Sequence, residues 1–200
     1  MTAGPRPSPP PDGGELARRA GALDWLLFDV DGVFTDGRLV YSPRGEELKC
    51  FHVRDGLAVK LARRSGLKVG LLSGRRSCAL ERRAADLGCD AVMLGSADKA
   101  PVFAAFLAEH ATAAVRVAYT GDDLPDLPIL AACGLSFCPA DADPEVRRRV
   151  DRVLAASGGA GAVREVVETV LKARGDWDGR IAAWAAAGVA LAAGSAGGTG

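Results

Sequence analysis

The sequence predicts an α/β protein whose strands form a doubly wound parallel sheet, and three observations lead to this fold class. Short apolar runs suited to buried strands alternate with segments of helical pattern. Nearly half of the 200 residues are apolar, at 48%, which is enough to build the core of one domain. Reactive side chains follow several of the apolar runs, as expected because function gathers at the carboxyl ends of parallel strands.

The predicted domain covers residues 15–175 and lies between two tails. Residues 1–14 hold five of the eleven prolines and little to bury, so this tail is predicted to be disordered. A short helical lead-in is expected at residues 15–22. Residues 176–200 are rich in Ala and Gly, and we predict a short helix at 181–191 followed by a loose end.

Within the domain, each predicted strand is a continuous apolar run, the pattern of strands that are buried on both faces. The strands are expected at residues 25–28, 68–72, 91–94, 115–120 and 135–138. The helices are expected at residues 57–65, 78–87, 101–110, 127–132, 144–150 and 163–173. Strands and helices that take turns in this way imply a parallel sheet with helices on both faces.

One segment interrupts the alternation directly after the first strand. Residues 38–41 and 47–53 are predicted strands around a turn at 42–45, and together they form a β-hairpin. The plain interpretation is an ordinary surface hairpin. Its position beside the expected site favours a flap or an oligomer contact.

Charge and cysteine content exclude several classes of protein. Lys+Arg and Asp+Glu both number 25, whereas a protein that binds nucleic acid or an anionic membrane normally has a basic surplus. The five cysteines show no CxxC pairing, which is typical of free thiols in a reducing compartment; they are Cys50, Cys78, Cys89, Cys133 and Cys138. The N-terminus has no apolar signal core, and the apolar stretch at 181–193 is shorter than the roughly 18 residues of a membrane span. These features predict a soluble cytoplasmic protein.

Two carboxylates follow the first strand in Asp29-Val30-Asp31-Gly32. Carboxylates two residues apart at a glycine turn are able to crowd around one cation, and one of them is able to act as a nucleophile while the other moves a proton. The plain alternative is a pair of aspartates that form a turn. Taken alone, the motif does not decide between these interpretations.

A hydroxyl and a lysine follow the next two strands. Ser73, in LLSGR at 71–75, precedes a helix, where exposed backbone N–H groups are able to hold a phosphate oxygen. Lys99 opens the following helix, where its charge opposes the helix dipole, so it needs another partner such as Asp29 and a phosphate. A plain helix N-cap and a solvated surface lysine are the alternatives when each residue is taken alone.

An acidic group follows the fourth strand in GDDLPD at 121–126. Asp122, Asp123 and Asp126 would repel one another unless a cation holds them, and no His or Cys lies nearby. A hard divalent ion with oxygen ligands therefore fits better than zinc. All four motifs stand at strand ends, and together they supply what phosphoryl transfer needs: a nucleophile, a metal and fixed positive or N–H groups.

These residues resemble the haloacid dehalogenase (HAD) superfamily of phosphotransferases. The resemblance runs from about residue 25 to about residue 173 and includes DVDGVFTDG around Asp29. Its other segments are GEELKCFHVRDGLAVK at 45–60, LLSGR at 71–75, GDDLPDLPIL at 121–130 and GGAGAVRE at 158–165. Within the superfamily, these motifs are similar to a capless branch that hydrolyses 3-deoxy-D-manno-octulosonate 8-phosphate in lipopolysaccharide biosynthesis.

The resemblance implies a role for each motif. Asp29 would be the nucleophile and Asp31 the general acid/base, and Mg²⁺ would be held by the Asp29 carboxylate, the Asp31 backbone carbonyl and Asp122. The other implied site residues are Ser73 and Lys99 for the phosphoryl group, and Asp123 and Asp126 to steady the metal loop.

The resemblance also implies a substrate site and an assembly. Branch members are homotetramers in which the hairpin takes part and a neighbouring subunit helps to close each site. Their sugar-phosphate contacts match His52, Val53, Arg54, Asp55, Gly56, Lys60, Arg75 and Arg83 in this sequence. Four of these are cationic and suit a substrate with both carboxylate and phosphate groups. Arginines on solvated helix faces are the plain alternative, as expected for Arg76 and Arg82.

Two departures and three rival functions accompany this hypothesis. Phe34 is larger than the residue usual in the branch, and the chain beyond Gly175 does not match the branch tail, which is able to reach a neighbouring site. The nearest rival substrate is a nine-carbon, sialic-acid-like nononate 9-phosphate. A non-catalytic HAD module that supports a sugar-nucleotide enzyme would have no reason to keep the whole acidic and basic set. A receiver domain would have no use for Asp31 as a proton shuttle.

Overall fold

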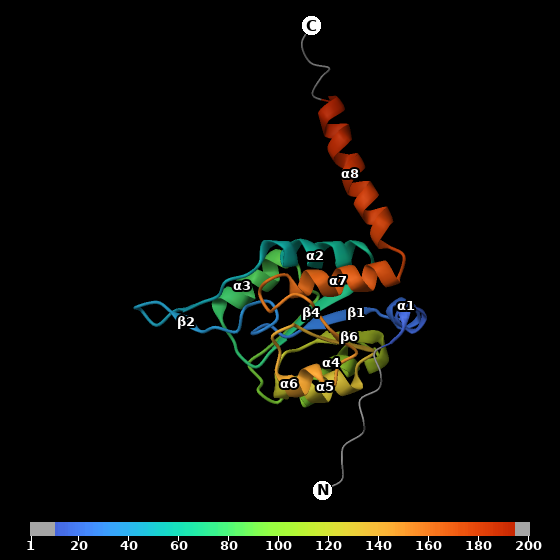
Figure 1. The fold of residues 1–200 in the computed structure, drawn as a ribbon. Helices are drawn as coiled ribbons and strands as arrows, with labels where there is room; N and C mark the ends of the chain where they lie inside the picture. The colour runs from blue at the N-terminus through green and yellow to red at the C-terminus, as the bar shows by residue number, and fades with distance from the viewer. Residues whose placement is uncertain (1–10, 195–200) are drawn as a thin grey trace.

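A six-stranded parallel sheet forms the centre of the protein, with helices on both faces (Figure 1). The structure, a computed structural model, describes residues 11–194, with side chains as far as residue 186. The strand order is β5-β4-β1-β6-β7-β8, so the chain starts in the middle of the sheet and extends it to both sides. The predicted doubly wound α/β fold is therefore confirmed.

The strands are β1 (Trp25–Phe28), β4 (Lys68–Ser73), β5 (Ala91–Leu94), β6 (Val117–Thr120), β7 (Leu135–Cys138) and β8 (Arg152–Val153). β1 pairs in parallel with β4 on one side and β6 on the other, and Phe28 is in register with Leu71 and Thr120. All residues of β1, β6 and β7 are buried, in agreement with their continuous apolar runs. The short edge strand β8 has exposed residues and no apolar run, so its sequence gave no strand signal.

Two helix layers enclose two cores. α2 (Val53–Arg64), α3 (Cys78–Leu87) and α7 (Ala162–Ala173) cover one face of the sheet, and α4 (Lys99–Glu109), α5 (Leu127–Ala132) and α6 (Pro144–Arg147) cover the other (Figure 1). The first core includes Phe28 and Val167, and the second includes Trp25 and Phe106. Trp25 and Phe106 meet edge to face with their ring centroids 4.8 Å apart, a favourable aromatic geometry.

The segment after β1 contains two very short strands, β2 (Val40–Tyr41) and β3 (Glu47–Leu48). They pair antiparallel, with Val40 opposite Leu48, and project from the body (Figure 1). The prediction that the second strand runs to residue 53 is wrong, because α2 already begins at Val53. Asp55 lies in the first turn of this helix, where a carboxylate is favoured by the helix dipole.

The loop after β1 packs against the loop before α7. A Cβ added at Gly158 would overlap the carbonyl oxygen of Gly32, so only glycine allows this backbone approach. The amide of Gly159 donates to Val33 O at 3.0 Å and fixes the contact. Phe34 is 1% exposed and meets Phe28 edge to face at 5.5 Å, so the larger side chain has been taken into the core.

Helices also occupy both ends of the described chain. α1 (Gly13–Gly21) begins two residues earlier than the predicted lead-in because Asp12 caps it. α8 (Trp177–Gly194) is longer than the helix predicted at 181–191 and extends away from the sheet (Figure 1). The predicted disorder of residues 1–10 and the loose end at 195–200 lie outside the described residues.

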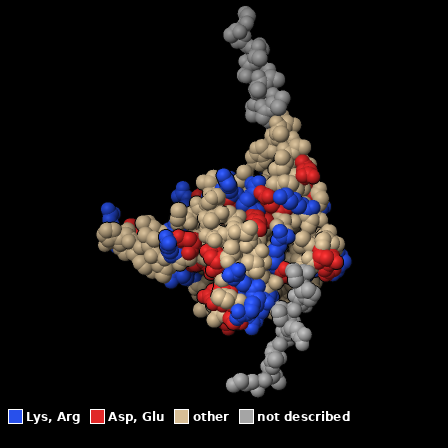
Figure 2. Space-filling view, viewed as in Figure 1, with Lys and Arg blue, Asp and Glu red and all other residues tan. Residues whose placement is uncertain are grey.

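Two sequence-based exclusions concern disulfides and membrane spans. All five cysteines are free thiols, as their spacing predicted. Among residues 11–194, no helix is both long and apolar enough to cross a membrane. Figure 2 shows acidic and basic side chains interspersed over the body on this face, whereas the projecting hairpin is mostly uncharged.

Candidate active site

The predicted chemical residues meet at the carboxyl edge of the central strands β1, β4 and β6. There a cavity of 390 Å³ is lined by Asp29, Asp31, Gly37, Ser73, Gly74, Arg75, Ala97, Lys99, Asp122, Asp123, Pro125 and Asp126. A larger hollow of 680 Å³ lies beside the C-terminal ends of α2 and α3. There Arg63 and Asp90 form an ion pair. The smaller cavity has the composition of a reaction site, and the strand-end rule for parallel sheets places the site there.

Asp29 and Lys99 form a buried ion pair in this cavity. The chain leaves β1 at Asp29, whose amide donates to Thr120 O at 2.9 Å and holds the residue against β6. Lys99 is 5% exposed, and its Nζ lies 2.9 Å from Asp29 Oδ2. A buried lysine needs anionic partners, and Asp29 supplies one of them. This pairing explains a lysine at the N-terminus of α4 despite the helix dipole.

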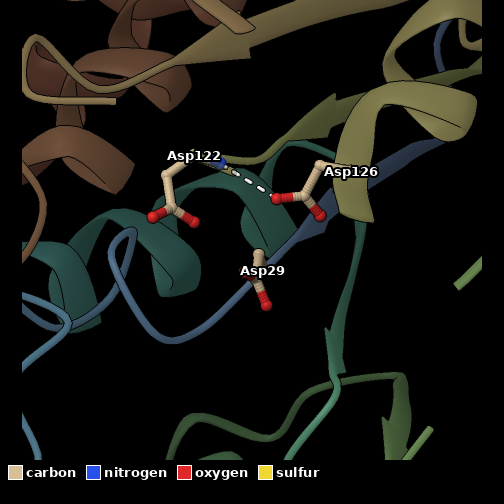
Figure 3. A group of neighbouring side chains, drawn as sticks. All are labelled: Asp29, Asp122 and Asp126. Atoms are coloured by element: carbon tan, nitrogen blue, oxygen red, sulfur yellow. Dashed lines mark hydrogen bonds between the residues drawn. The ribbon is translucent and has the colours of Figure 1, made fainter. Parts of the chain in front are cut away.

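Asp126 organises the acidic loop. Its Oδ1 accepts from Lys99 Nζ at 2.6 Å and from Tyr119 Oη at 2.5 Å. Its Oδ2 accepts from the amides of Asp122 and Asp123 at 3.0 and 3.2 Å. The first of these amide bonds is the dashed line in Figure 3. Since both oxygens are engaged by donors, Asp126 steadies the loop and offers little capacity for a further ligand.

Asp122 and Asp29 have the properties of cation ligands. One oxygen from each of Asp29, Asp122 and Asp126 lies within 4.8 Å of the others, and their carboxylates face a common space (Figure 3). Asp122 Oδ1 is buried and has no hydrogen-bond partner among the described residues. A Cβ at Gly32 would overlap the Asp122 carboxylate, so glycine at this turn admits the side chain to the site.

Burial and repulsion make this cluster costly without a cation. Burial, with repulsion from Asp126, raises the pKa of Asp29 to about 6 although Lys99 opposes the shift. Burial, with repulsion from Asp29 and Asp126, raises the pKa of Asp122 to about 8. A hard divalent cation with oxygen ligands would relieve both effects, so the donor set fits Mg²⁺.

Asp31 faces the same cavity from the loop that follows β1. Lys49 Nζ lies 2.5 Å from Asp31 Oδ1 and 2.8 Å from Glu47 Oε1. The second oxygen of Asp31 is buried and has no hydrogen-bond partner among the described residues. Lys49 and Glu47, at the base of the hairpin, therefore take part in the site. Neither was among the site residues predicted from the sequence.

Ser73 and Arg75 complete the cavity wall after β4. Ser73 is 2% exposed, and its Oγ accepts from the Arg75 amide at 3.2 Å. The Arg75 side chain turns toward the hairpin, where its Nη2 donates to Glu47 at 2.8 Å and to Tyr41 Oη at 3.3 Å. A cationic group thus stands at the rim of the cavity, between β4 and the hairpin.

Most other predicted substrate contacts lie outside this cavity. Val53, Gly56, Lys60 and Arg83 line a separate cavity of 270 Å³ beside α2 and α3. Arg83 Nη2 donates to His52 O at 3.4 Å across the start of α2, and Arg54 is exposed on α2. Of the predicted substrate set, the single chain brings Arg75 to the Asp29 cavity and holds the others, except the buried Asp55, on a second surface around the start of α2.

Asp55 lies in the interior. Its carboxylate is fully buried, and its Oδ1 accepts from the Arg164 amide at 2.8 Å, which ties the start of α2 to the start of α7. Burial raises the pKa of Asp55, and the amide bond opposes the shift. In the described chain the Asp55 side chain is therefore buried inside the protein and does not line the Asp29 cavity.

Three residues of the site escaped the sequence-based reasoning: Glu47, Lys49 and Tyr119. Glu47 and Lys49 fell within a predicted strand, where alternating charged residues usually indicate a solvated face. Tyr119 stood in an apolar run and counted as core. The position of the hairpin near the site was the signal that pointed to the first two.

This fold and this site define a HAD-type phosphohydrolase: a parallel sheet with an aspartate at the end of its central strand, a second aspartate two residues later, and a lysine and an acidic loop beside them. The comparisons with known proteins agree. The chain is 45% identical over 153 residues to the 3-deoxy-D-manno-octulosonate 8-phosphate phosphatase KdsC of Haemophilus influenzae, with 76% of this chain and 85% of that protein covered. The chain belongs to this phosphatase family, whose members are phosphomonoester hydrolases. No family model matches the chain.

Two solved structures extend the comparison. The 3-deoxy-D-manno-octulosonate 8-phosphate phosphatase from Yersinia pestis has a TM-score of 0.80 and 39% identity, and the match covers 82% of this chain and 89% of that one. The enzyme of the same name from Moraxella catarrhalis, in complex with a magnesium ion, a phosphate ion and KDO, has a TM-score of 0.83 and 33% identity. That match covers 86% of this chain and 98% of the other.

Proposed function

We propose that this chain is a Mg²⁺-dependent phosphatase that hydrolyses 3-deoxy-D-manno-octulosonate 8-phosphate through an aspartyl-phosphate. The observation that carries the proposal is the buried Asp29–Lys99 pair beside Asp122, whose buried oxygen has no partner among the described residues. A structural ion pair would not need an unsatisfied carboxylate next to it. The family relationship supplies the substrate class.

In the first half of the reaction, Asp29 attacks the phosphorus atom of the substrate. A bond forms between an Asp29 carboxylate oxygen and phosphorus while the bond from phosphorus to the sugar oxygen breaks. Asp31 gives its proton to the departing sugar oxygen. Lys99 and the Ser73 hydroxyl lie in the same cavity and offset the negative charge on the phosphoryl oxygens.

In the second half, water replaces the aspartate. The Asp31 carboxylate takes a proton from a water molecule whose oxygen bonds to phosphorus, and the bond to Asp29 breaks. Free phosphate leaves, and Asp29 is a carboxylate again. Asp29, Asp122 and the backbone carbonyl of Asp31 would hold Mg²⁺, which supplies charge neutralisation for the anionic cluster and the phosphoryl group.

Substrate selectivity gives the first test, because Arg75 adds a cation beyond what one phosphate needs. A charge-assisted contact is worth about 1.5–3 kcal/mol, and the exposure of Arg75 favours the lower end, roughly tenfold in selectivity. We expect the eight-carbon ulosonate phosphate to be hydrolysed at least tenfold more efficiently than a neutral-headed hexose phosphate. In R75A this preference should fall while hydrolysis of an aryl phosphate is kept, as kcat/KM for each substrate would reveal.

A control and a rival belong in the same phosphate-release assay. Arg76→Ala removes a neighbouring exposed arginine and should leave the preference unchanged. The nine-carbon nononate 9-phosphate is the rival substrate, and greater efficiency with it would reassign the sugar. Equal efficiency with ulosonate and hexose phosphates would contradict the sugar-acid assignment. The complete Asp29, Asp31, Lys99 and Asp122 set offers no support for a non-catalytic module.

We also propose a homotetramer built through the hairpin. Its residues Leu39, Val40, Tyr41 and Leu48 are 47–57% exposed, an unusual density of large apolar side chains on a projecting arm. A neighbouring copy would cover this surface and bring its own second cavity, with Lys60 and Arg83, toward an Asp29 site. The free thiols suit a reducing compartment, so we place the assembly in the cytoplasm.

Light scattering tests the assembly. We expect the unmodified protein to have the mass of a tetramer and V40E/L48E to dissociate, because two carboxylates at these exposed cross-strand positions would have to be buried in the proposed apolar contact. Val115→Glu, which alters an exposed apolar residue outside the hairpin, should leave the mass unchanged. A fully active monomer of the unmodified protein would refute the tetramer.

A further inference from the structure

Lys49 is a buried lysine in the connection between the hairpin and α2. Its side chain is 2% exposed, whereas an ordinary lysine keeps its ammonium group in water. Within the described residues its ion-pair partners are Asp31 at 2.5 Å and Glu47 at 2.8 Å. A lysine that is withdrawn from solvent and placed on the carboxylate next to the nucleophile is not explained by packing alone.

Because of Lys49, the two carboxylate oxygens of Asp31 have different surroundings. Oδ1 is occupied by Lys49, and Oδ2 is buried, faces no hydrogen-bond partner among the described residues and remains available. Asp31 otherwise sits on a loop, where a carboxylate is able to rotate about its side-chain bonds. An ion pair that holds one oxygen restricts this rotation and fixes the direction of the other.

We propose that Lys49 is a positioning residue that holds Asp31 so that its Oδ2 exchanges the proton of the reaction. This inference rests on the proposed phosphatase function and extends it to a residue of the inserted hairpin. The effect is expected in the second half of the reaction, where the water oxygen bonds to phosphorus, the proton passes to Oδ2 of Asp31 and the Asp29 carboxylate leaves, because a mobile water molecule then has to meet an oxygen held in a fixed direction.

Glu47 extends the contact to the cavity rim. Its Oε1 forms an ion pair with Lys49 at 2.8 Å and its Oε2 accepts from Arg75 at 2.8 Å, so one hairpin carboxylate joins the positioning lysine to the arginine proposed for the substrate. Asp31, Lys49, Glu47 and Arg75 thus form a row of alternating charges. The hairpin aligns the proton-transfer group and the substrate arginine together.

A double-mutant cycle with a phosphoenzyme measurement tests the proposal on the full chain with Mg²⁺. K49M should lower kcat at least tenfold without raising KM, and rapid-quench experiments should find more aspartyl-phosphate than in the unmodified protein. K49R keeps the charge and should recover most of kcat. In the D31N background, K49M should change kcat less than twofold, because Lys49 acts through Asp31.

The control is R19M, which removes a similarly enclosed pair between Arg19 and Asp151 far from the cavity. R19M should lower the melting temperature without raising the aspartyl-phosphate level. The proposal is overturned if K49M keeps kcat within twofold, if kcat falls with no rise in aspartyl-phosphate, or if the same factor is lost in D31N. K49Q replaces K49M if the latter does not fold. If the unmodified protein itself forms no aspartyl-phosphate, the proposed phosphatase mechanism fails, and not only the role of Lys49. The two failures can therefore be told apart.

Discussion

We expect Asp29→Asn to lower turnover by ~10⁴-fold or more, because an amide is a poor nucleophile at phosphorus. The fold should survive the change. Asn has nearly the same shape as Asp, and it removes a carboxylate whose pKa is already raised to about 6 by burial and by repulsion from Asp126. Lys99 keeps Asp126 as an ion-pair partner at 2.6 Å.

Phosphate release and thermal unfolding together measure this effect. We expect D29N to keep a melting temperature close to that of the unmodified protein while its phosphate release falls to the background rate. Asp24→Asn is the matched control, since Asp24 precedes β1 and forms an ion pair with Arg116 at the surface, away from the cavity. An active D29N enzyme would require another nucleophile and would remove the basis for the aspartyl-phosphate.

Removal of Mg²⁺ should abolish activity and lower stability, and the loss of stability should depend on pH. In the metal-free protein the pKa of Asp29 is raised to about 6 and that of Asp122 to about 8, mainly by burial. A carboxyl whose pKa is raised on folding binds protons more tightly in the folded state, so stability falls as pH rises toward the folded-state value. The metal-free protein should therefore lose stability between about pH 4 and pH 8.

Mg²⁺ needs both carboxylates ionised, so it should stabilise the protein more at pH 8 than at pH 6. At a hundredfold excess over its Kd, a ligand adds about 2.7 kcal/mol, which corresponds to roughly 5–10 °C in the melting temperature of a domain of this size. Melting curves with EDTA and with Mg²⁺ at both pH values measure this difference. Asp122→Asn should remove most of the shift, and full turnover after exhaustive chelation would refute the metal assignment.

The sequence predicted the fold well because its strands are buried on both faces. Continuous apolar runs such as 25–28 and 135–138 leave little choice of structure, and both strands were confirmed. The ends of helices and strands that are set by capping and by local hydrogen bonds were predicted less accurately from the sequence. The strand predicted at 115–120 begins at Val117 because residues Ala114–Arg116 form a 3₁₀ helix.

The site was predictable where the chemistry depends on residue type at a strand end. Asp29, Ser73, Lys99 and Asp122 meet in one cavity because the central strands are parallel and end together. The partners of Asp31 were not predictable, since Lys49 is brought to it by a hairpin whose path no local pattern specifies. The second cavity beside α2 likewise depends on how helices pack, which spacing along the chain does not encode.

The place of Lys99 has a consequence for the evolution of this fold. A cation at the start of α4, an acidic residue buried at the end of β1 and a carboxylate oxygen that lacks a partner each oppose folding locally. Such local conflicts concentrate where selection has favoured activity over robustness. Substitutions that resolve them would give a more stable but inactive protein. At the carboxyl edge of this sheet, stability is therefore given up for activity, and packing in the rest of the core has to make up the difference.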